Sequence, residues 1–232
     1  MNALLILIQE PITDPLGSDS GGLSPVHYQA LLEVLLQQLE GLHDTHVRFC
    51  YSPADAGEAL QFFLLPLLRG QVHKRRHDFL FTPEKNAPAF TIGFTPLEAH
   101  AIGQALTNTI ESLYREGFNK VAVMGSDSPA CGSRWIKTAL SQTKPKSPSL
   151  GLNHAGEPYF IASTEASDFA YLAEALGPLT VSLPSQRPAL TTQAFMLPAL
   201  EHVRNVSEWE DALNSAIGGK LKAAFNRQKE HC

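Results

Sequence analysis

The chain of 232 residues is 44% hydrophobic and 18% charged, with a formal net charge of −5. This length is enough to bury a core within one domain, so we expect a single domain over residues 1–232. An acidic balance without a dominant basic block gives no electrostatic basis for binding nucleic acid or an anionic membrane. The apolar residues 1–8 are too few for a membrane span or a signal peptide, so we expect no membrane insertion.

The three cysteines lie far apart and share no metal-ligand spacing: Cys50, Cys131 and Cys232. An odd number without a framework of pairs is typical of a reducing compartment, which predicts a cytoplasmic protein. Cys131 could be reactive if it lay at a helix N-terminus. Free cysteine is among the most buried residue types, so we expect an inert thiol there.

The chain begins with a strand and a helix. Residues 3–8 form a continuous apolar run, which predicts a buried strand, and a long polar loop follows over residues 12–26. Ser24 is a typical N-cap and Pro25 a typical first helical residue, so a helix should start there and reach about Glu40. Its apolar stripe consists of Leu31, Leu32, Leu35, Leu36 and Leu39.

A second strand and helix come next. Alternating side chains over residues 47–51 predict the strand. A helix should follow over residues 54–68, and we expect Pro66 to kink or end it. The basic cluster 73–77 could contact phosphate, but charge runs of this size usually form a solvated loop. A short strand is predicted over residues 78–81.

A helix that runs directly into a strand occupies the middle of the chain. Residues 95–98, Thr-Pro-Leu-Glu, form a capping box with proline in the first turn, which predicts a helix start. Apolar side chains recur every three or four positions from 102 to 113, so the helix should last to about Glu116, where Gly117 ends it. The apolar strand over residues 118–124 follows at once, and such a crossover builds parallel sheets.

The polar segment Gly-Ser-Asp-Ser-Pro ends this central strand. Gly125 permits close approach of a ligand, and Pro129 ends the strand pairing. Asp127 is therefore expected at the carboxyl end of a central strand, where open α/β sheets bind their ligands. The alternative is a simple turn in which Asp127 bonds its own backbone.

The rest of the chain predicts shorter elements. They are a helix over residues 135–140, strands over 150–153 and 158–162, a helix over 165–176, a strand over 179–183, a closing sheet position at Val203, and a helix opened by a capping box at 207–210. No internal repeat or linker divides the chain. The order of elements predicts an α/β fold in three layers, with a mostly parallel central sheet and helices on both faces.

The segment from 117 to 129 reads G-F-N-K-V-A-V-M-G-S-D-S-P. It resembles the G-x-x-x-V-v-x-x-G-[ST]-D-[SC]-P segment of a bacterial glycosyltransferase-like family of the nucleotide-diphospho-sugar transferase superfold, GT-A type. Some members of that family are assigned to arsenosugar biosynthesis. The resemblance implies a GT-A fold, Mg²⁺ or Mn²⁺ as cofactor, and a nucleotide or nucleotide sugar as ligand. It also implies that Asp127 is the metal-binding aspartate.

Elsewhere the chain matches the spacing of the family's motifs, but other residues replace the charged ones. The family's basic loop after the first strand is replaced by Gln9 and an acidic, glycine-rich stretch, with no Lys or Arg before Arg48. A later acidic pair of the family falls on His154 and its neighbour, and two aspartates near the end fall on His202 and Arg204. A diphosphate needs its charge neutralised by a carboxylate-bound metal or by Lys and Arg, so these changes predict an impaired or lost donor site.

The candidate site residues follow from the strand ends and from the resemblance. Asp127 is the candidate metal ligand, and we expect it to face a cleft lined by Gln9, His154 and Tyr159. The candidate nucleotide- or substrate-binding residues are Gln9, Ser126, Ser128, His154, Tyr159, His202 and Arg204. No residue is assigned a catalytic role.

Three functions fit the sequence. The first is a divergent glycosyltransferase-like protein with an impaired or lost nucleotide-sugar donor site. The second is an active glycosyl- or nucleotidyltransferase whose phosphate site is rebuilt from His154, His202 and Arg204. The third is a non-catalytic binding or regulatory module, since a fold alone does not determine function.

Overall fold

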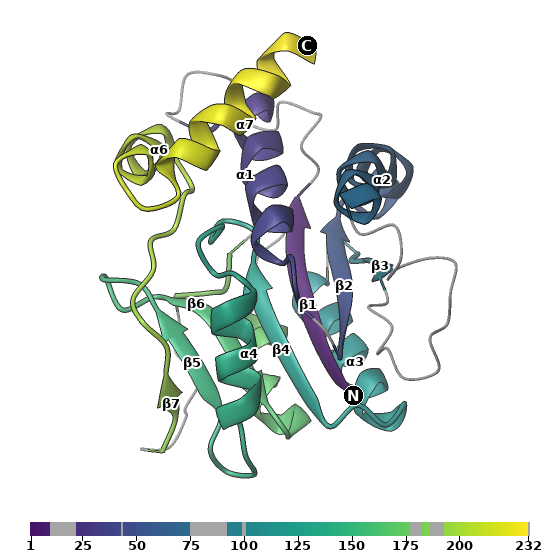
Figure 1. Ribbon diagram of the computed structural model, residues 1–232. Coiled ribbons are helices and arrows are strands. Elements are labelled where there is room, and N and C mark those ends of the chain that lie inside the picture. The colour runs from purple at the N-terminus through teal and green to yellow at the C-terminus, as the bar shows by residue number, and fades with distance from the viewer. Residues whose placement is uncertain are drawn as a thin grey trace.

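The computed structural model describes residues 1–9, 22–42, 44–74, 92–98, 101–176, 182–185 and 193–231. Its core is a seven-stranded sheet in the order β3-β2-β1-β4-β6-β5-β7 (Figure 1). The strands are β1 (Asn2–Gln9), β2 (Thr45–Ser52), β3 (Ile92–Pro96), β4 (Lys120–Gly125), β5 (Ser149–Leu152), β6 (Pro158–Ser163) and β7 (Phe195–Met196). Within this described sheet β6 runs antiparallel to both of its neighbours and the other pairings are parallel, so the mostly parallel sheet is confirmed.

Helices cover both faces of the sheet (Figure 1). One face carries α1 (Pro25–Gln38), α2 (Gly57–Lys74), which follows the short helix η2 (Ala54–Ala56), and α4 (Ser133–Gln142). The other face carries α3 (Ile102–Arg115), η3 (Ala166–Phe169) and α5 (Leu172–Ala175). The predicted three layers are therefore confirmed. Two further helices, α6 (Val206–Leu213) and α7 (Gly218–His231), pack on α1 and add a cluster outside the three layers.

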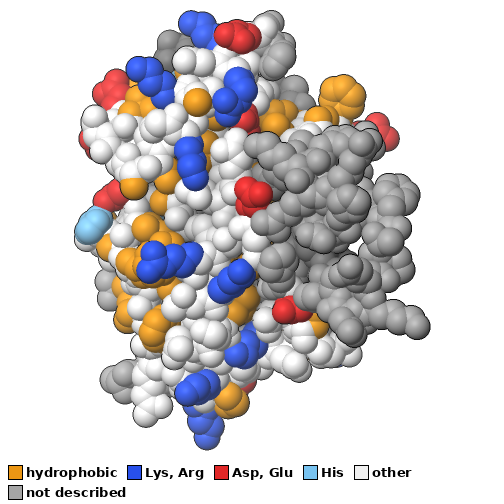
Figure 2. All heavy atoms as spheres, viewed as in Figure 1, with side chains coloured by type: hydrophobic (Ala, Val, Ile, Leu, Met, Phe, Trp, Pro, Cys, Tyr) orange, Lys and Arg blue, Asp and Glu red, His pale blue; other side chains and the backbone are white. Residues whose placement is uncertain are grey.

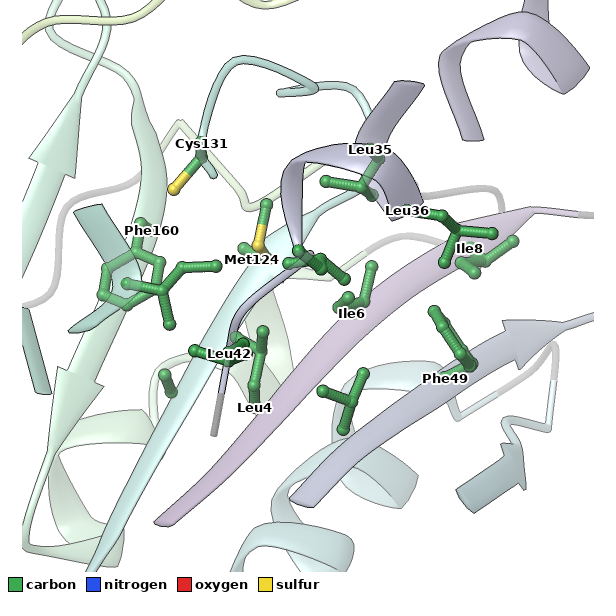
Figure 3. Packing of buried hydrophobic residues seen from close by; sticks show 14 of the residues in the cluster. Leu4, Ile6, Ile8, Leu35, Leu36, Leu42, Phe49, Met124, Cys131 and Phe160 are labelled. Carbon is green, nitrogen blue, oxygen red and sulfur yellow. The ribbon is translucent and has the colours of Figure 1, made fainter. Parts of the chain in front are cut away.

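The two central strands, β1 and β4, are apolar on both faces because both faces are covered. Leu4, Ile6 and Ile8 of β1 pack toward α1, as Figure 3 shows, whereas Leu5 and Leu7 belong to the cluster on the α3 side. These five side chains are at most 2% exposed. β4 lies between β1 and β6, so the predicted interior strand at 118–124 is confirmed, with its bounds shifted to Lys120–Gly125.

Helix α1 starts as predicted, with Ser24 as N-cap and Pro25 in the first turn. The residue that completes the capping box is His27, whose Nδ1 accepts a hydrogen bond from the Ser24 backbone N–H at 3.2 Å. The His27 ring also packs against Trp209 and Phe225, at centroid distances of 4.8 and 4.7 Å. Burial lowers the pKa of His27, because the protonated ring loses hydration.

This histidine gives a testable pH dependence. A lowered folded-state pKa means that the unfolded chain binds the proton more tightly, so the free energy of unfolding should fall as pH drops below about 6.5, the ordinary histidine pKa. His27→Gln keeps a capping-box acceptor and removes the titrating group. The free energy of unfolding, measured by urea melts between pH 7.5 and 5.5, should therefore depend less steeply on pH in this variant than in wild type. His154→Gln, at an exposed position, is the control. Equal slopes in wild type and His27→Gln would contradict this account.

Pro66 was expected to kink or end its helix. It does not end the helix, because α2 runs through Pro66 to Lys74. Proline removes the bond to the carbonyl of residue 62. Phe62 is 83% exposed, so water can reach that part of the helix. Only the first two residues of the basic cluster 73–77 belong to α2. The remainder of the cluster and the strand predicted over 78–81 lie outside the described residues.

The capping box predicted at 95–98 is also wrong. Thr95 and Pro96 belong to β3 and pair with Cys50 and Tyr51 of β2, and α3 begins only at Ile102. Pairing with β2 outweighs the local helix signal, and proline is tolerated because β3 lies at an edge of the described sheet. The end of the helix is as predicted: Arg115 is its last residue, and Gly117 takes the left-handed conformation with φ +93°.

The C-terminal third departs most from the predictions. The helix expected over 165–176 is two short pieces, η3 and α5. The strand expected over 179–183 is absent at its two described residues, 182 and 183, and its other residues lie outside the described ranges. The last strand is β7, not Val203. The cap of α6 is Asn205, whose Oδ1 accepts from the Glu208 backbone N–H at 2.9 Å, because the chain turns into the helix two residues before Ser207.

Basic side chains are dispersed over one face of the molecule (Figure 2). Figure 2 shows Lys and Arg side chains spread over the face that carries α4 and α7, separated by uncharged surface, so the described part of that face offers no continuous basic patch. None of the described helices is long and apolar enough to cross a membrane.

Candidate functional site

Asp127 lies just after the carboxyl end of β4, at the point where the order of the strands in the sheet reverses. β4 ends at Gly125 beside Leu7 of β1, and the Ser126 backbone N–H donates to the Leu7 carbonyl at 3.1 Å. The chain builds β2 and β3 on one side of β1 and β4 on the other, so this is the point where strand order reverses. Open α/β sheets bind ligands outside the carboxyl ends of the strands at such a point. The segment after β4 is therefore the candidate site.

The Asp127 carboxylate is only 2% exposed and is held by neighbouring side chains. The Ser182 hydroxyl donates to Oδ2 at 2.5 Å and the Ser128 hydroxyl to Oδ1 at 3.3 Å. Burial raises the pKa of Asp127, whereas the nearby His202 and the two serine hydroxyls oppose that rise. These partners are side chains rather than amides of its own turn, so the structure does not support the simple-turn alternative.

His202 lies beside this carboxylate and is 3% exposed. Its Nδ1 lies 3.8 Å from Asp127 Oδ2 and 3.6 Å from Glu157 Oε2, and Asn153 Nδ2 lies 3.4 Å from the same nitrogen. The opposite nitrogen, Nε2, is buried and has no hydrogen-bond partner among the described residues. The Asn153 amide nitrogen can only donate, which makes Nδ1 an acceptor, whereas the two carboxylates favour a proton on the same nitrogen, so the neighbours of Nδ1 assign no single tautomer.

Arg204 joins two further acids to the site. Its NH1 lies 2.9 Å from Glu157 Oε2, and its NH2 lies 3.0 Å from Glu208 Oε1. Burial alone would raise the pKa of both glutamates, but hydrogen bonds and the Arg204 charge outweigh it and lower each pKa. Both carboxylates are therefore ionised at neutral pH, and Arg204 is their common counter-ion.

Two loops bring these residues together. The loop between β5 and β6 is closed by Asn153, whose Oδ1 accepts from the Glu157 backbone N–H at 2.8 Å. The segment before α6 is tied to the end of β4 because the Val203 backbone N–H donates to the Asp127 carbonyl at 2.8 Å. Ser185 extends the contact, since its hydroxyl donates to Glu157 Oε1 at 2.9 Å.

The structure does not bring His154 or Tyr159, two of the residues expected to line a cleft, to Asp127. The side chain of His154 is 72% exposed and pairs with Glu201 at 3.3 Å. Tyr159 is buried in the core cluster on the α1 face, where its hydroxyl donates to the Pro198 carbonyl at 2.7 Å. The side chain of Gln9 lies outside the described residues. Of the predicted binding residues, the structure brings Ser128, His202 and Arg204 to Asp127, and Ser126 is buried beside it in the chain.

Five residues of the network are not among the predicted site residues: Asn153, Glu157, Ser182, Ser185 and Glu208. A signal existed for Glu208, which was predicted as part of a capping box. Glu157 lies three residues after the position where an acid was counted as lost, and nothing local shows that its carboxylate returns to the site. Ser182 and Ser185 gave no signal, because isolated serines are common in polar loops.

The arrangement is poorly suited to a divalent metal. Across the described residues, no group of three His, Cys, Asp or Glu side chains could hold a metal ion. Mg²⁺ and Mn²⁺ need several oxygen ligands with free lone pairs in a regular geometry. The Asp127 oxygens instead accept from two serine hydroxyls, and the glutamates bind Arg204.

The mostly parallel seven-stranded sheet with helices on both faces matches the fold of a solved nucleotide-diphospho-sugar transferase-like structure. The chain is similar in fold to a protein from Desulfovibrio desulfuricans described as a nucleotide-diphospho-sugar transferase, with a TM-score of 0.61, 18% identity, and coverage of 98% of this chain and 97% of that chain. A cytidylyltransferase from Leptospira borgpetersenii gives a TM-score of 0.53, 11% identity, and coverage of 99% and 94%. No protein-family model and no curated protein sequence matches the chain.

Proposed function

We propose that this chain is a glycosyltransferase-like protein that has lost the metal-dependent donor site for nucleotide sugars. One observation carries the proposal: the Asp127 carboxylate, the expected metal ligand, is 2% exposed and is occupied by Ser182, Ser128 and His202. The fold supports a transferase ancestry, and both similar proteins bear transferase names. Cys50 and Cys131 are free and buried, which supports the inert thiol expected at Cys131 and a cytoplasmic location.

The charge of the site gives the proposal a second support. Asp127, Glu157 and Glu208 supply more negative charge than Arg204 and His202 can neutralise, so a diphosphate would be repelled. The hypothesis of a phosphate site rebuilt from His154, His202 and Arg204 is therefore not favoured. Each of these three side chains already faces at least one carboxylate.

The experiment is calorimetric titration of UDP-, GDP- and dTDP-sugars, with and without Mn²⁺ or Mg²⁺. We expect weak or undetectable binding in every case. Losing two charge-assisted bonds to phosphate, at about 1.5–3 kcal/mol each, lowers affinity by roughly two to four decades. Micromolar affinity that requires Mn²⁺ and disappears in Asp127→Ala would show that the donor site works and that the proposal is wrong.

A second candidate is an active transferase that needs no metal. The observation in its favour is His202, a buried imidazole held by two carboxylates on Nδ1 with Nε2 unpaired among the described residues. With its proton on Nδ1, such a histidine can accept a proton from a ligand hydroxyl at Nε2. Binding that is independent of metal and lost in His202→Ala would favour this candidate over the lost-site proposal.

A further inference from the structure

Arg204 contacts the carboxylates of the candidate site in the way that a bound metal ion would. Its Nε and NH2 lie 3.3 and 3.0 Å from the two oxygens of Glu208, which is a forked contact, and its NH1 lies 2.9 Å from Glu157 Oε2. The planar guanidinium thus spans two carboxylates with all three of its nitrogens. The Arg204 backbone N–H donates to Glu208 Oε2 at 2.8 Å as well, so the side chain is fixed at both ends.

Asp127 is the third carboxylate near this guanidinium. The bond from the Val203 backbone N–H to the Asp127 carbonyl, 2.8 Å, brings the residue before Arg204 against the end of β4. The Glu208 carboxylate first, and after it those of Glu157 and Asp127, raise the pKa of Arg204. Arg204 is therefore permanently charged at the point where three acids converge.

The site also contains a buried polar atom that the network does not satisfy. His202 Nε2 has no partner among the described residues, although the ring is 3% exposed. The ring nitrogen that faces the carboxylates is Nδ1, so Nε2 adds no ligand to them, and the carboxylates alone supply the oxygen ligands that a divalent metal prefers. Arg204 supplies the positive charge that Glu157 and Glu208 face, in the place that a metal ion would take.

We propose that Arg204 is the resident cation of this site and that it excludes divalent metal from Asp127, Glu157 and Glu208. The inference rests on the proposed function, because it gives a physical reason why a site that holds three carboxylates has no metal-dependent donor site. Without the guanidinium, the carboxylates of Glu157 and Glu208 lose their main counter-charge, and a divalent cation becomes the best available replacement.

The test is the variant Arg204→Met, which keeps an unbranched side chain and removes the charge. Mn²⁺ binding is measured by calorimetry, and the melting temperature is measured with and without Mn²⁺. We expect Arg204→Met to bind Mn²⁺ at least tenfold more tightly than wild type and to gain melting temperature from Mn²⁺. Adding Glu157→Gln should remove most of that gain. Arg134→Met is the matched control, because Arg134 is exposed and stacks on Trp135 with its guanidinium carbon 4.9 Å from the ring centroid.

Two results would overturn the inference. One is Mn²⁺ binding to wild type that disappears in Asp127→Asn, since metal and Arg204 would then share the site. The other is Arg204→Met binding Mn²⁺ no more tightly than wild type or Arg134→Met. If Arg204→Met is unfolded without metal, refolding in millimolar Mn²⁺ supports the inference, and failure to refold counts against it.

These outcomes are separate from those of the proposed function. Nucleotide-sugar titrations of wild type decide whether the donor site is lost, whatever Arg204→Met does. A wild type that binds no nucleotide sugar, together with Arg204→Met that gains no Mn²⁺ affinity, would leave the proposed function standing and remove only the role of Arg204.

Discussion

Gly103→Ala is expected to destabilise the protein by about 2–3 kcal/mol, the cost of overpacking a close backbone contact. Gly103 lies in α3 where α5 crosses it, and an added Cβ would lie 2.1 Å from the Leu172 carbonyl oxygen and 2.7 Å from that of Ala173. Both neighbours are backbone atoms, so no side-chain rotation can relieve the clash and the two helices must separate. For a domain of this size the melting temperature should fall by roughly 5–10 °C.

The matched control for Gly103→Ala is Gly219→Ala. Gly219 lies in the first turn of α7, and nothing lies within 4 Å of its added Cβ. Alanine lowers the entropy cost of helix formation by about 0.5–1 kcal/mol, so this substitution should be neutral or stabilising. Thermal melts of the two variants measure the difference. Similar melting temperatures would mean that α3 and α5 are not packed as closely as the structure shows.

Arg227→Ala is expected to lower the free energy of unfolding by about 2 kcal/mol, because it leaves the buried Glu33 carboxylate without its counter-charge. Arg227 of α7 pairs with Glu33 of α1, with NH2 and Oε1 2.6 Å apart. The Glu33 side chain is 9% exposed, whereas that of Arg227 is 49% exposed. Removing the arginine leaves a buried carboxylate with hydrogen bonds only from Gln37 and Gln228 among the described residues. The exposed half of Arg227 lowers the cost from the 3–5 kcal/mol typical of a fully buried pair.

The reverse change, Glu33→Leu, should cost less than Arg227→Ala. Arg227 can turn its guanidinium into water, and leucine at position 33 fills an apolar place between α1 and α7. The double variant Glu33→Leu with Arg227→Met should be close to wild type, because it leaves no buried charge unpaired. Urea unfolding ranks the three variants by their free energy of unfolding. A Glu33→Leu variant less stable than Arg227→Ala would refute the account of the buried carboxylate.

The sequence alone determined the elements whose signals are local. The apolar run of β4 predicted an interior strand because only a strand covered on both faces is apolar at every position. Ser24 with Pro25, and Gly117 at φ +93°, marked helix ends that depend on neighbouring residues. These elements also placed Asp127 at the carboxyl end of a central strand, since a helix-to-strand crossover builds parallel strands whose carboxyl ends lie at one edge of the sheet.

The tertiary structure decided what depends on residues far apart in the chain. Pairing with β2 made Thr95 a strand residue despite its helix-cap pattern, because sheet hydrogen bonds outweigh one cap. The partner of Asp127 is Ser182, 55 positions away, and the partner of Asn153 is His202, 49 positions away. A sequence pattern cannot show which distant carboxylate neutralises which cation. For this reason the hypothesis of a rebuilt phosphate site treated His202 and Arg204 as free positive charges. Only the fold shows that Arg204 is held by Glu157 and Glu208, since that balance is set by burial and distance.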